Sequence, residues 1–379
     1  MIFSVRKINN LNLLALILLA LYSCNQKKGY TARTSLNKVK YANCLSIFEH
    51  EKFVEVTVRS SENKEQIYVL YKGKRPVNIN ADAYIKVPIK SIICTSTSHL
   101  PALDMLGEAA KLTGFPGTKW IYNASMRNRV ALGKIDDVGM KQELDVEKVM
   151  SLKPDVLMTY NSPNGMHKLK LIEQAGSVVI LNNDYLETTP LGRAEWLKLT
   201  GYLTGKVKEA DSIFKQITTT YDSLTAKASS AGNRPAVLTG IMYGDVWYLP
   251  GGNSYAAKFF EDAGAKYPWQ ENEVTGSISL GFENVFSKAQ KADFWIGTGS
   301  FNTYEALADA DEKYTYFEAF KNKNIFSYTK KVNELGSNDY LESGYARPDL
   351  ILADYIQMLQ STGKAGINYH DLHYFEPLK

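Results

Sequence analysis

The sequence has few of the residues and motifs that mark a disulfide scaffold, a nucleic-acid-binding protein or a common type of enzyme. Of its 379 residues only three are cysteines and five are histidines. Lys and Arg total 44 against 40 Asp and Glu, which leaves no basic footprint for nucleic acid. The G-x-S-x-G elbow, the Walker loop and the H-E-x-x-H helix are all absent from the sequence. These absences argue against catalysis and leave an exported hydrolase as an unlikely alternative.

The chain also lacks an apolar run of the ~20 residues that a bilayer-spanning helix needs. Its longest run, LNLLALILLALYS, is shorter and follows the basic pair Arg6 and Lys7, a pattern typical of a signal peptide. The run ends in LYSC, which resembles the lipobox of bacterial lipoproteins and would make Cys24 the lipidated residue. An ordinary secretory signal with an incidental cysteine is the alternative. We therefore expect a signal peptide (1–23), a polar tether (24–43) and an exported, periplasmic lipoprotein anchored to a membrane.

Two cysteines remain after Cys24, and export would permit them to pair. Cys94 lies inside an apolar strand, and no sequence pattern pairs it with Cys44. We therefore expect two buried free thiols, with a disulfide as the open alternative.

The rest of the chain predicts a small β segment followed by two α/β lobes. Period-two runs between Cys44 and Val87 indicate antiparallel hairpins, an accessory segment at 44–88. From Ser91 onward, near-continuous apolar strands alternate with helices, including a strand at KWIYN, which is typical of a parallel sheet covered on both faces. The same order recurs later, so we expect an N-terminal lobe at 89–190 and a C-terminal lobe at 231–379.

A single long helix is predicted between the lobes, inside a linking segment at 191–230. From Lys206 to Ala228 the apolar residues recur at spacings of three and four, which places them on one face of a helix. Such a helix would be about 34 Å long at 1.5 Å per residue. It would connect the lobes stiffly and allow only small opening and closing.

Two α/β lobes, one long helix and a lipoprotein-like N-terminus resemble the class III periplasmic binding proteins, the substrate-binding subunits of ABC importers for ferric siderophores, haem and cobalamin. The resemblance covers about 89–359 and rests on VEKVMSLKPDVLMTY, LGRAEWLKLTGYLTGKVKEADSIF and GYARPDLILADYIQML. It implies binding and delivery without catalysis or a resident cofactor. The partners would be an ABC permease, a separate ATPase and a small metal-chelate ligand, which could be an iron chelate, haem or cobalamin.

One pattern of acidic, apolar and polar residues occurs twice, in DVEKVMSLKPDVLMTY and in GFENVFSKAQKADFWIGTG. The resemblance implies that Glu147 and Glu283, at matching positions, pair with arginines of the two permease halves. Charge pairs of this kind set orientation and association rate more than affinity. The alternative is that each glutamate only stabilises its own helix, because its negative charge lies near the positive end of the helix dipole.

Ligands of open parallel sheets bind beyond the carboxyl ends of the strands. The side chains expected there are aromatic and polar, which suits a large, flat ligand. Arginines nearby would meet the carboxylates or catecholates of an iron chelate. The predicted ligand-binding residues are Ser96, His99, Tyr122, Arg127 and Tyr160 from the N-terminal lobe, and Tyr243, Trp247, Tyr255 and Arg347 from the C-terminal lobe.

A bare zinc or manganese ion is a further alternative, because His99 and His167 follow two of the strands. Such a site needs three or four N or O ligands, and the second lobe offers no histidine before residue 370. We therefore expect no site for a bare metal ion. His99 itself could be an axial ligand to a chelated metal or could cap the following helix, and we favour the cap.

Overall fold

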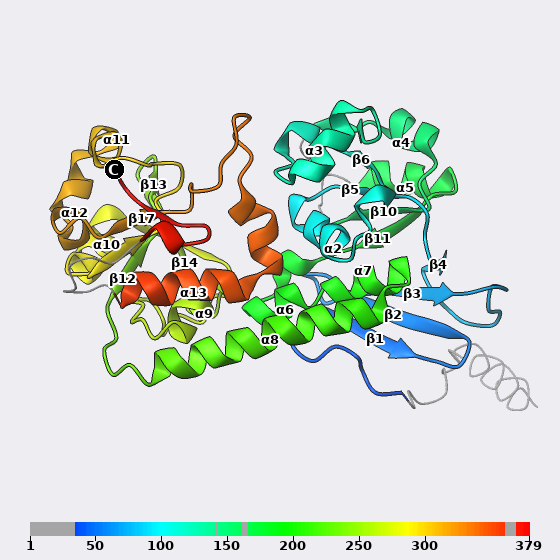
Figure 1. Cartoon of the computed structure of the whole chain (residues 1–379), viewed down its shortest axis with the longest axis horizontal. Coiled ribbons are helices and arrows are strands. Elements are labelled where there is room, and N and C mark those ends of the chain that lie inside the picture. Colours follow the sequence, from blue (N-terminus) through cyan, green and yellow to red (C-terminus); the bar gives the residue numbers. More distant parts are fainter. Residues whose placement is uncertain (1–34, 141–142, 161–165, 361–368) are drawn as a thin grey trace, which may run out of the picture. The chain divides into compact units, whose positions relative to one another are not determined.

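The computed structural model describes residues 35–140, 143–160, 166–360 and 369–379. The predicted signal peptide, Cys24 and most of the predicted tether lie outside these ranges. Residues 37–379 form one compact unit (Figure 1). No helix in the described ranges is both long enough and apolar enough to cross a membrane.

The accessory segment is a four-stranded sheet, as the period-two pattern predicts. Its strands lie in chain order, β1 (Leu45–Glu49), β2 (Phe53–Arg59), β3 (Glu65–Tyr71) and β4 (Ala83–Lys86). The first three are antiparallel, but β4 runs parallel to β3, so the expectation of hairpins throughout was wrong at this strand. The residues between β3 and β4 return the chain to the starting end of β3, which makes the parallel pairing possible.

The next sheet is parallel, with the order β11-β10-β5-β6-β7. Its short strands are largely buried, as a sheet covered on both faces requires. They are β5 (Ile92–Cys94), β6 (Leu112–Phe115), β7 (Asp136–Asp137), β10 (Val156–Thr159) and β11 (Val178–Leu181). The connecting helices are α2 (Leu100–Met105), α3 (Ala124–Ala131), α4 (Val146–Leu152) and α5 (Met166–Gln174), and β8 (Gly139–Met140) pairs with β9 (Glu143–Leu144).

One strand of this lobe differs from the prediction. The KWIYN segment, expected as a strand, contains a 3-10 turn at Thr118–Trp120, and the strand lies earlier, at β6. The helix before it ends at Met105 because Gly107 adopts a left-handed conformation with φ +70°. The chain is therefore free to form β6 well before KWIYN.

The second parallel sheet has the order β12-β16-β17-β18, with an antiparallel edge strand at β18. A three-stranded antiparallel sheet, which the sequence pattern did not predict, pairs β13, β14 and β15. The strands are β12 (Val237–Thr239), β13 (Met242–Tyr243), β14 (Val246–Pro250), β15 (Ser277–Gly281), β16 (Phe294–Ile296), β17 (Ile325–Ser327) and β18 (Glu376–Pro377). The helices are α9 (Tyr255–Asp262), α10 (Phe282–Ala289), α11 (Tyr304–Ala310), α12 (Glu318–Lys321) and α13 (Pro348–Leu359).

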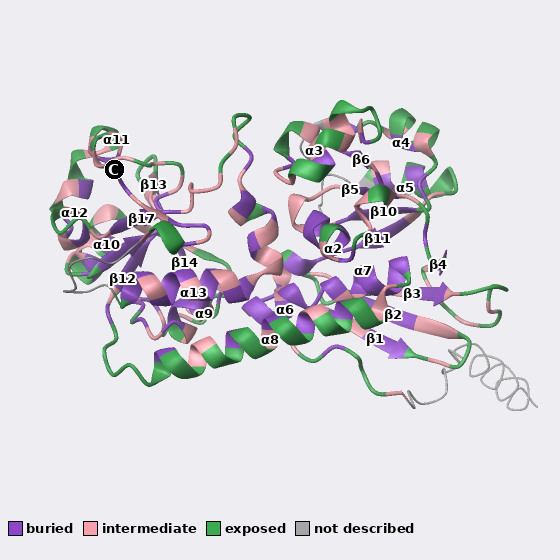
Figure 2. Cartoon of the chain, viewed as in Figure 1, coloured by how far each residue is buried: buried purple, intermediate pink, exposed green. Residues whose placement is uncertain are grey.

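Between the two parallel sheets the chain forms α6 (Pro190–Ala194), α7 (Leu197–Thr204) and the long helix α8 (Val207–Ser229). The bounds of α8 lie one residue from those predicted. Its exposed face and its buried stripe are visible in Figure 2. Phe214 packs in a cluster with residues of α2, α6 and α7, whereas Ile217 and Tyr221 pack in the core around the second parallel sheet. The helix therefore contacts both halves of the fold.

The last part of the predicted tether is bound to this connecting region. The Glu195 carboxylate, which is fully buried, accepts hydrogen bonds from the backbone N–H groups of residues 40–42 at 2.6–3.0 Å. Glu187 accepts from those of Asn43 and Cys44 at 2.7 and 2.9 Å. Residues 40–43 are thus part of the folded protein, which corrects the tether boundary at 43.

Both described cysteines are free thiols. Cys94 is fully buried, but Cys44 is only half-buried, so the expectation of two buried thiols was wrong for Cys44. Burial raises the pKa of the Cys44 thiol to about 11.

Candidate functional site

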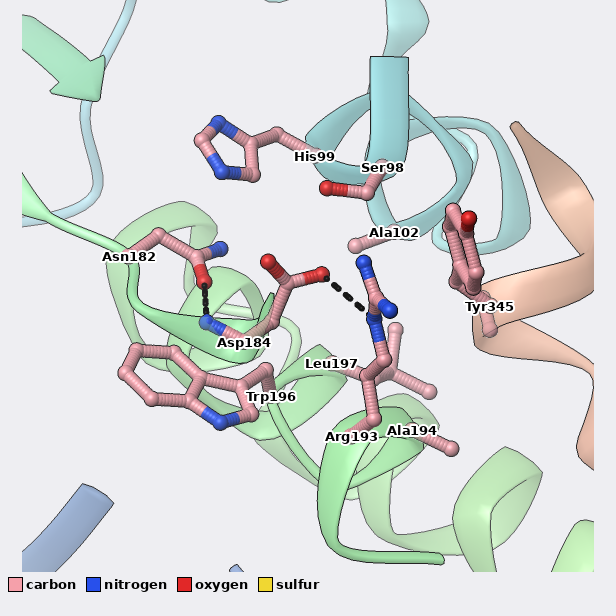
Figure 3. Close-up of a pocket in the computed structure, with 11 residues that line it drawn as sticks. Ser98, His99, Ala102, Asn182, Asp184, Arg193, Ala194, Trp196, Leu197 and Tyr345 are labelled. Carbon is pink, nitrogen blue, oxygen red and sulfur yellow. Dashed lines mark hydrogen bonds and ion pairs between the residues drawn. The ribbon is translucent and has the colours of Figure 1, made fainter. Parts of the chain in front are cut away.

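A small cavity lies at the carboxyl edge of the first parallel sheet (Figure 3). The chain leaving β5 forms the turn Thr97–His99, and the chain leaving β11 forms the turn Asp184–Leu186. These turns, with α6 and the turn Ser343–Ala346, surround a cavity of about 20 Å³, room for about one water molecule. It is lined by Ser98, His99, Ala102, Asn182, Asp184, Arg193, Ala194, Trp196, Leu197, Tyr345 and Ala346.

Arg193 is the charged centre of this cavity. Its Nε lies 3.4 Å from the Asp184 carboxylate, and its guanidinium carbon lies 3.5 Å from the centre of the Tyr345 ring. Burial lowers the pKa of Arg193, but Asp184, Tyr345 and Tyr255 together more than offset this, and the pKa is raised overall. The guanidinium therefore stays charged, held between a carboxylate and an aromatic face, the two environments that suit it.

His99 faces the same space and makes no hydrogen bond of normal geometry through either ring nitrogen within the described residues. It is 2% exposed, and burial lowers its pKa, so the ring is neutral at pH 7. Its expected role as a helix cap was wrong. His99 is the N-cap residue of α2 but its side chain makes no capping hydrogen bond, whereas Ser96 caps the preceding turn through Ser98 N–H at 3.3 Å. One side of the imidazole lies near the backbone of Asn182, and the neutral ring can still offer a nitrogen to water or to one polar group of a ligand.

A segment from the second half of the chain, residues 331–346, closes the cavity on one side; we call it the strap (orange in Figure 1). Its Glu342 carboxylate accepts hydrogen bonds from the backbone N–H groups of Tyr122 and Asn123, at 2.7 and 2.9 Å. The Ser337 hydroxyl donates to the Ile121 carbonyl at 3.2 Å.

Two further contacts join the strap to the first half of the chain. The Thr97 hydroxyl donates to the Leu341 carbonyl at 3.1 Å, and Arg127 pairs with Glu334 at 2.7 Å. The strap is thus attached at four places to the turn that follows β5, the loop that follows β6 and helix α3.

Among the carboxylates of the strap, Glu342 has the most strongly shifted pKa. It is 3% exposed, and burial raises its pKa to about 7, although the two backbone N–H donors act in the opposite direction. Asp339 and Asp104 raise the pKa further because they are also negative. A buried carboxylate with no cationic partner among the described residues is costly when ionised, so the attachment of the strap is linked to pH.

The structure brings together only part of the predicted ligand-binding set. Ser96, His99 and Tyr122 lie in the loops at the carboxyl edge, and Tyr255 lies near the cavity with Arg193 over its ring at 5.3 Å. The hydroxyl of Tyr255 is buried without a hydrogen-bond partner in the described structure. Tyr160 follows β10 and packs edge-on against Tyr185, with ring centres 5.9 Å apart.

The other predicted residues have different environments. Trp247 is fully buried in the core and donates from its indole N–H to the Thr239 carbonyl at 3.0 Å, so its prediction as a ligand contact was wrong. Its apolar surface is more favourable against the rings of Trp295 and Phe317 than at a solvated edge. Arg347 is held by Asp349 in a bidentate pair, and Tyr243 is 83% exposed on a hairpin.

The two candidate docking glutamates have matching positions. Glu147 lies in the first turn of α4 and Glu283 in the first turn of α10, and both are exposed. Neither carboxylate has a hydrogen bond or ion pair to another described residue. This placement is compatible with docking to a permease, and it is equally compatible with each glutamate only stabilising its own helix through the helix dipole.

Sequence reasoning missed Asn182, Asp184, Arg193 and Glu342. The first two had a usable signal, because SVVILNND places amide and acid residues directly after a buried strand. No signal pointed to Glu342, whose partners lie about 220 positions away along the chain. No group of three His, Cys, Asp or Glu side chains able to hold a metal ion occurs in the described part of the chain.

Comparison with known proteins identifies the family. The model of the periplasmic binding protein family matches residues 92–332, more than half of the chain. An uncharacterised lipoprotein of Methanocaldococcus jannaschii is 25% identical, with 76% of this chain and 69% of that protein covered. A substrate-binding lipoprotein of an ABC transporter from Bacillus subtilis, also uncharacterised, is 26% identical over 40% of this chain and 46% of its own.

Solved structures share the fold. A possible iron-binding periplasmic solute-binding protein of Staphylococcus epidermidis superposes with a TM-score of 0.56 at 19% identity, covering 72% of this chain and 99% of its own. The triscatecholate siderophore-binding protein of Bacillus subtilis superposes with a TM-score of 0.54 at 17% identity, covering 73% and 94%. Because the family model matches more than half of the chain, the chain belongs to the periplasmic binding protein family.

Proposed function

We propose that this protein is the lipid-anchored substrate-binding subunit of an ABC importer and that it captures a metal chelate for delivery to a permease. The match of the family model across residues 92–332 carries the proposal. Lipidation at Cys24 is supported by the lipobox-like LYSC and by the lipoprotein names of the relatives. The ATPase and the permease would be separate chains.

The ligand would bind at the carboxyl edge of the first sheet, where His99, Arg193 and Tyr345 converge. Arg193 supplies a fixed positive charge for a carboxylate or catecholate, and Tyr345 and Tyr255 supply aromatic faces. A cavity of about 20 Å³ holds only about one water molecule, so a chelate, haem or cobalamin would enter after the strap has moved. Separation of Glu342 from the Tyr122 and Asn123 amides is therefore the opening step of our mechanism.

Two alternatives remain weaker. A bare zinc or manganese ion would need more donors than His99 and Asp184 provide together. An exported hydrolase would need an activated nucleophile, and His99 has no hydrogen-bonded serine, cysteine or threonine partner in the described structure.

Docking would use Glu147 and Glu283, one for each half of the permease. The double variant Glu147→Ala plus Glu283→Ala should retain ligand affinity but lose uptake, because charge pairs with the permease would be absent. Glu209→Ala plus Glu305→Ala is a matched control, since both residues are exposed and lie in the first turns of other helices. Normal uptake by the first double variant, or equal loss in the control, would refute the docking role.

The ligand class can be tested by tryptophan fluorescence of the chain from Asn25 onward, titrated separately with cobalamin, haemin and a ferric catecholate. Trp196 lines the cavity and should be quenched by the bound ligand, so Trp196→Phe should remove most of the signal. Trp247→Phe is the control, because Trp247 lies in the core. Saturable quenching by one compound identifies its class, and no saturable change with any of them argues against a chelate ligand.

A further inference from the structure

The accessory sheet and the adjoining ends of α4 and α5 carry a lysine-rich surface that the importer role does not use. Two neighbouring hollows of about 620 and 880 Å³ share Tyr71 and Val87 in their walls. The lysines that line them, which we call the basic face, are Lys52, Lys72, Lys74, Lys86, Lys90 and Lys153. Five of these six lie before residue 92, where the match to the family model begins.

The positive charge of the basic face is largely uncompensated. All six lysines are exposed, and none forms an ion pair with another described residue. Three carboxylates line the same hollows. Of these, Glu49 is paired with Lys38 at 2.8 Å, whereas Glu51 and Asp155 have no cationic partner among the described residues, so two unpaired carboxylates lie beside six lysines.

Apolar side chains project beside these lysines. Val77 is 75% exposed in the connection between β3 and β4, which also carries Lys72, Lys74 and Arg75. Met150, 40% exposed, lines the larger hollow. Exposed apolar side chains among lysines are a composition that suits the interface of an anionic membrane, where the charges meet phosphates and the apolar groups enter the headgroup layer.

We propose that the basic face rests on an anionic phospholipid membrane surface, as a second attachment besides the lipid anchor. Cys24 precedes Asn37, where the compact unit begins, by thirteen residues, and these span at most about 45 Å when extended. The accessory sheet follows directly, so the anchor keeps it close to the membrane. A polybasic surface is a common second signal that acts together with a lipid anchor.

The test is co-sedimentation of the chain from Asn25 onward, unlipidated, with vesicles of pure phosphatidylcholine or with 40% phosphatidylglycerol added. We expect binding to the anionic vesicles only, and we expect it to weaken as the salt concentration shortens the screening length from ~10 Å at 0.1 M to ~3 Å at 1 M. Each lysine removed should weaken binding about fivefold, so Lys72→Gln, Lys74→Gln and Lys86→Gln together should weaken it roughly 100-fold. The matched control is Lys208→Gln, Lys215→Gln and Lys227→Gln, three exposed lysines of α8.

Several outcomes would overturn the proposal. They are absence of binding to anionic vesicles, equal loss in the α8 control, or unchanged binding by the triple variant of the basic face. Competition by millimolar inorganic phosphate at constant ionic strength would instead assign the hollows to a small free anion. Val77→Ser, which changes no charge, should weaken binding if this side chain enters the headgroup layer, and an unchanged affinity would show that the lysines alone make the contact. Circular dichroism of each variant checks that it is folded, and failure here would leave the importer role intact.

Discussion

Glu342 should make the closure of the strap depend on pH. In the closed strap burial raises its pKa to about 7, whereas a carboxylate released to water returns to about 4.5. The closed state therefore binds the proton more tightly, and acid favours closure. As the pH rises from 4.5 to 7, closure loses about 3 kcal/mol, and above 7 it loses little more. Between pH 6 and pH 8 the open population should rise about tenfold.

Hydrogen exchange of the Tyr122 and Asn123 amides measures this opening directly, because both N–H groups donate to Glu342. After correction for the intrinsic pH dependence of exchange, protection should fall about tenfold from pH 6 to pH 8. Glu342→Gln cannot ionise and should show no such change. Glu334→Gln is the matched control on the same strap and should keep the tenfold change between pH 6 and pH 8, because the lowered pKa of Glu334 leaves this exposed carboxylate ionised throughout that range. Constant protection in the unmodified protein, or a persistent tenfold change in Glu342→Gln, would refute the reasoning.

Three further predictions concern stability and can be measured by thermal or urea unfolding. Arg193→Met should cost about 3–5 kcal/mol because it leaves Asp184 buried and unpaired, and adding Asp184→Asn should recover part of the loss; no recovery would contradict the ion-pair explanation. Trp247→Ala should cost about 3–5 kcal/mol as a large deletion in the core, and a cost below 1 kcal/mol would contradict its buried position. Glu195→Gln should cost about 1–3 kcal/mol and expose residues 40–44 to limited proteolysis, whereas unchanged protection would show that other contacts hold this segment.

Local periodicity predicted most of the elements but not the closure of the site. The bounds of α8 were predicted to within one residue because its apolar stripe is long and regular. The segment KWIYN was misassigned because three of its five residues are apolar or aromatic, a composition shared by buried strands and short turns. Glu342 could not be predicted, because its role depends on amides far away in sequence and on a desolvation that only the folded chain creates.

The attachment of residues 40–44 to Glu187 and Glu195 has a mechanical consequence for a membrane-tethered protein. Tension applied through the N-terminus would first reach Asn37 and Lys38, which are hydrogen-bonded to the backbone of Ile47 in β1, and then these buried carboxylates. The load would therefore be shared between β1 of the accessory sheet, the turn before α6 where Glu187 lies, and the end of α6 where Glu195 lies. The residues around α6 connect the two parallel sheets, and Arg193 of α6 packs against Tyr345 of the strap, so a pull on the tether would act next to a contact of the strap.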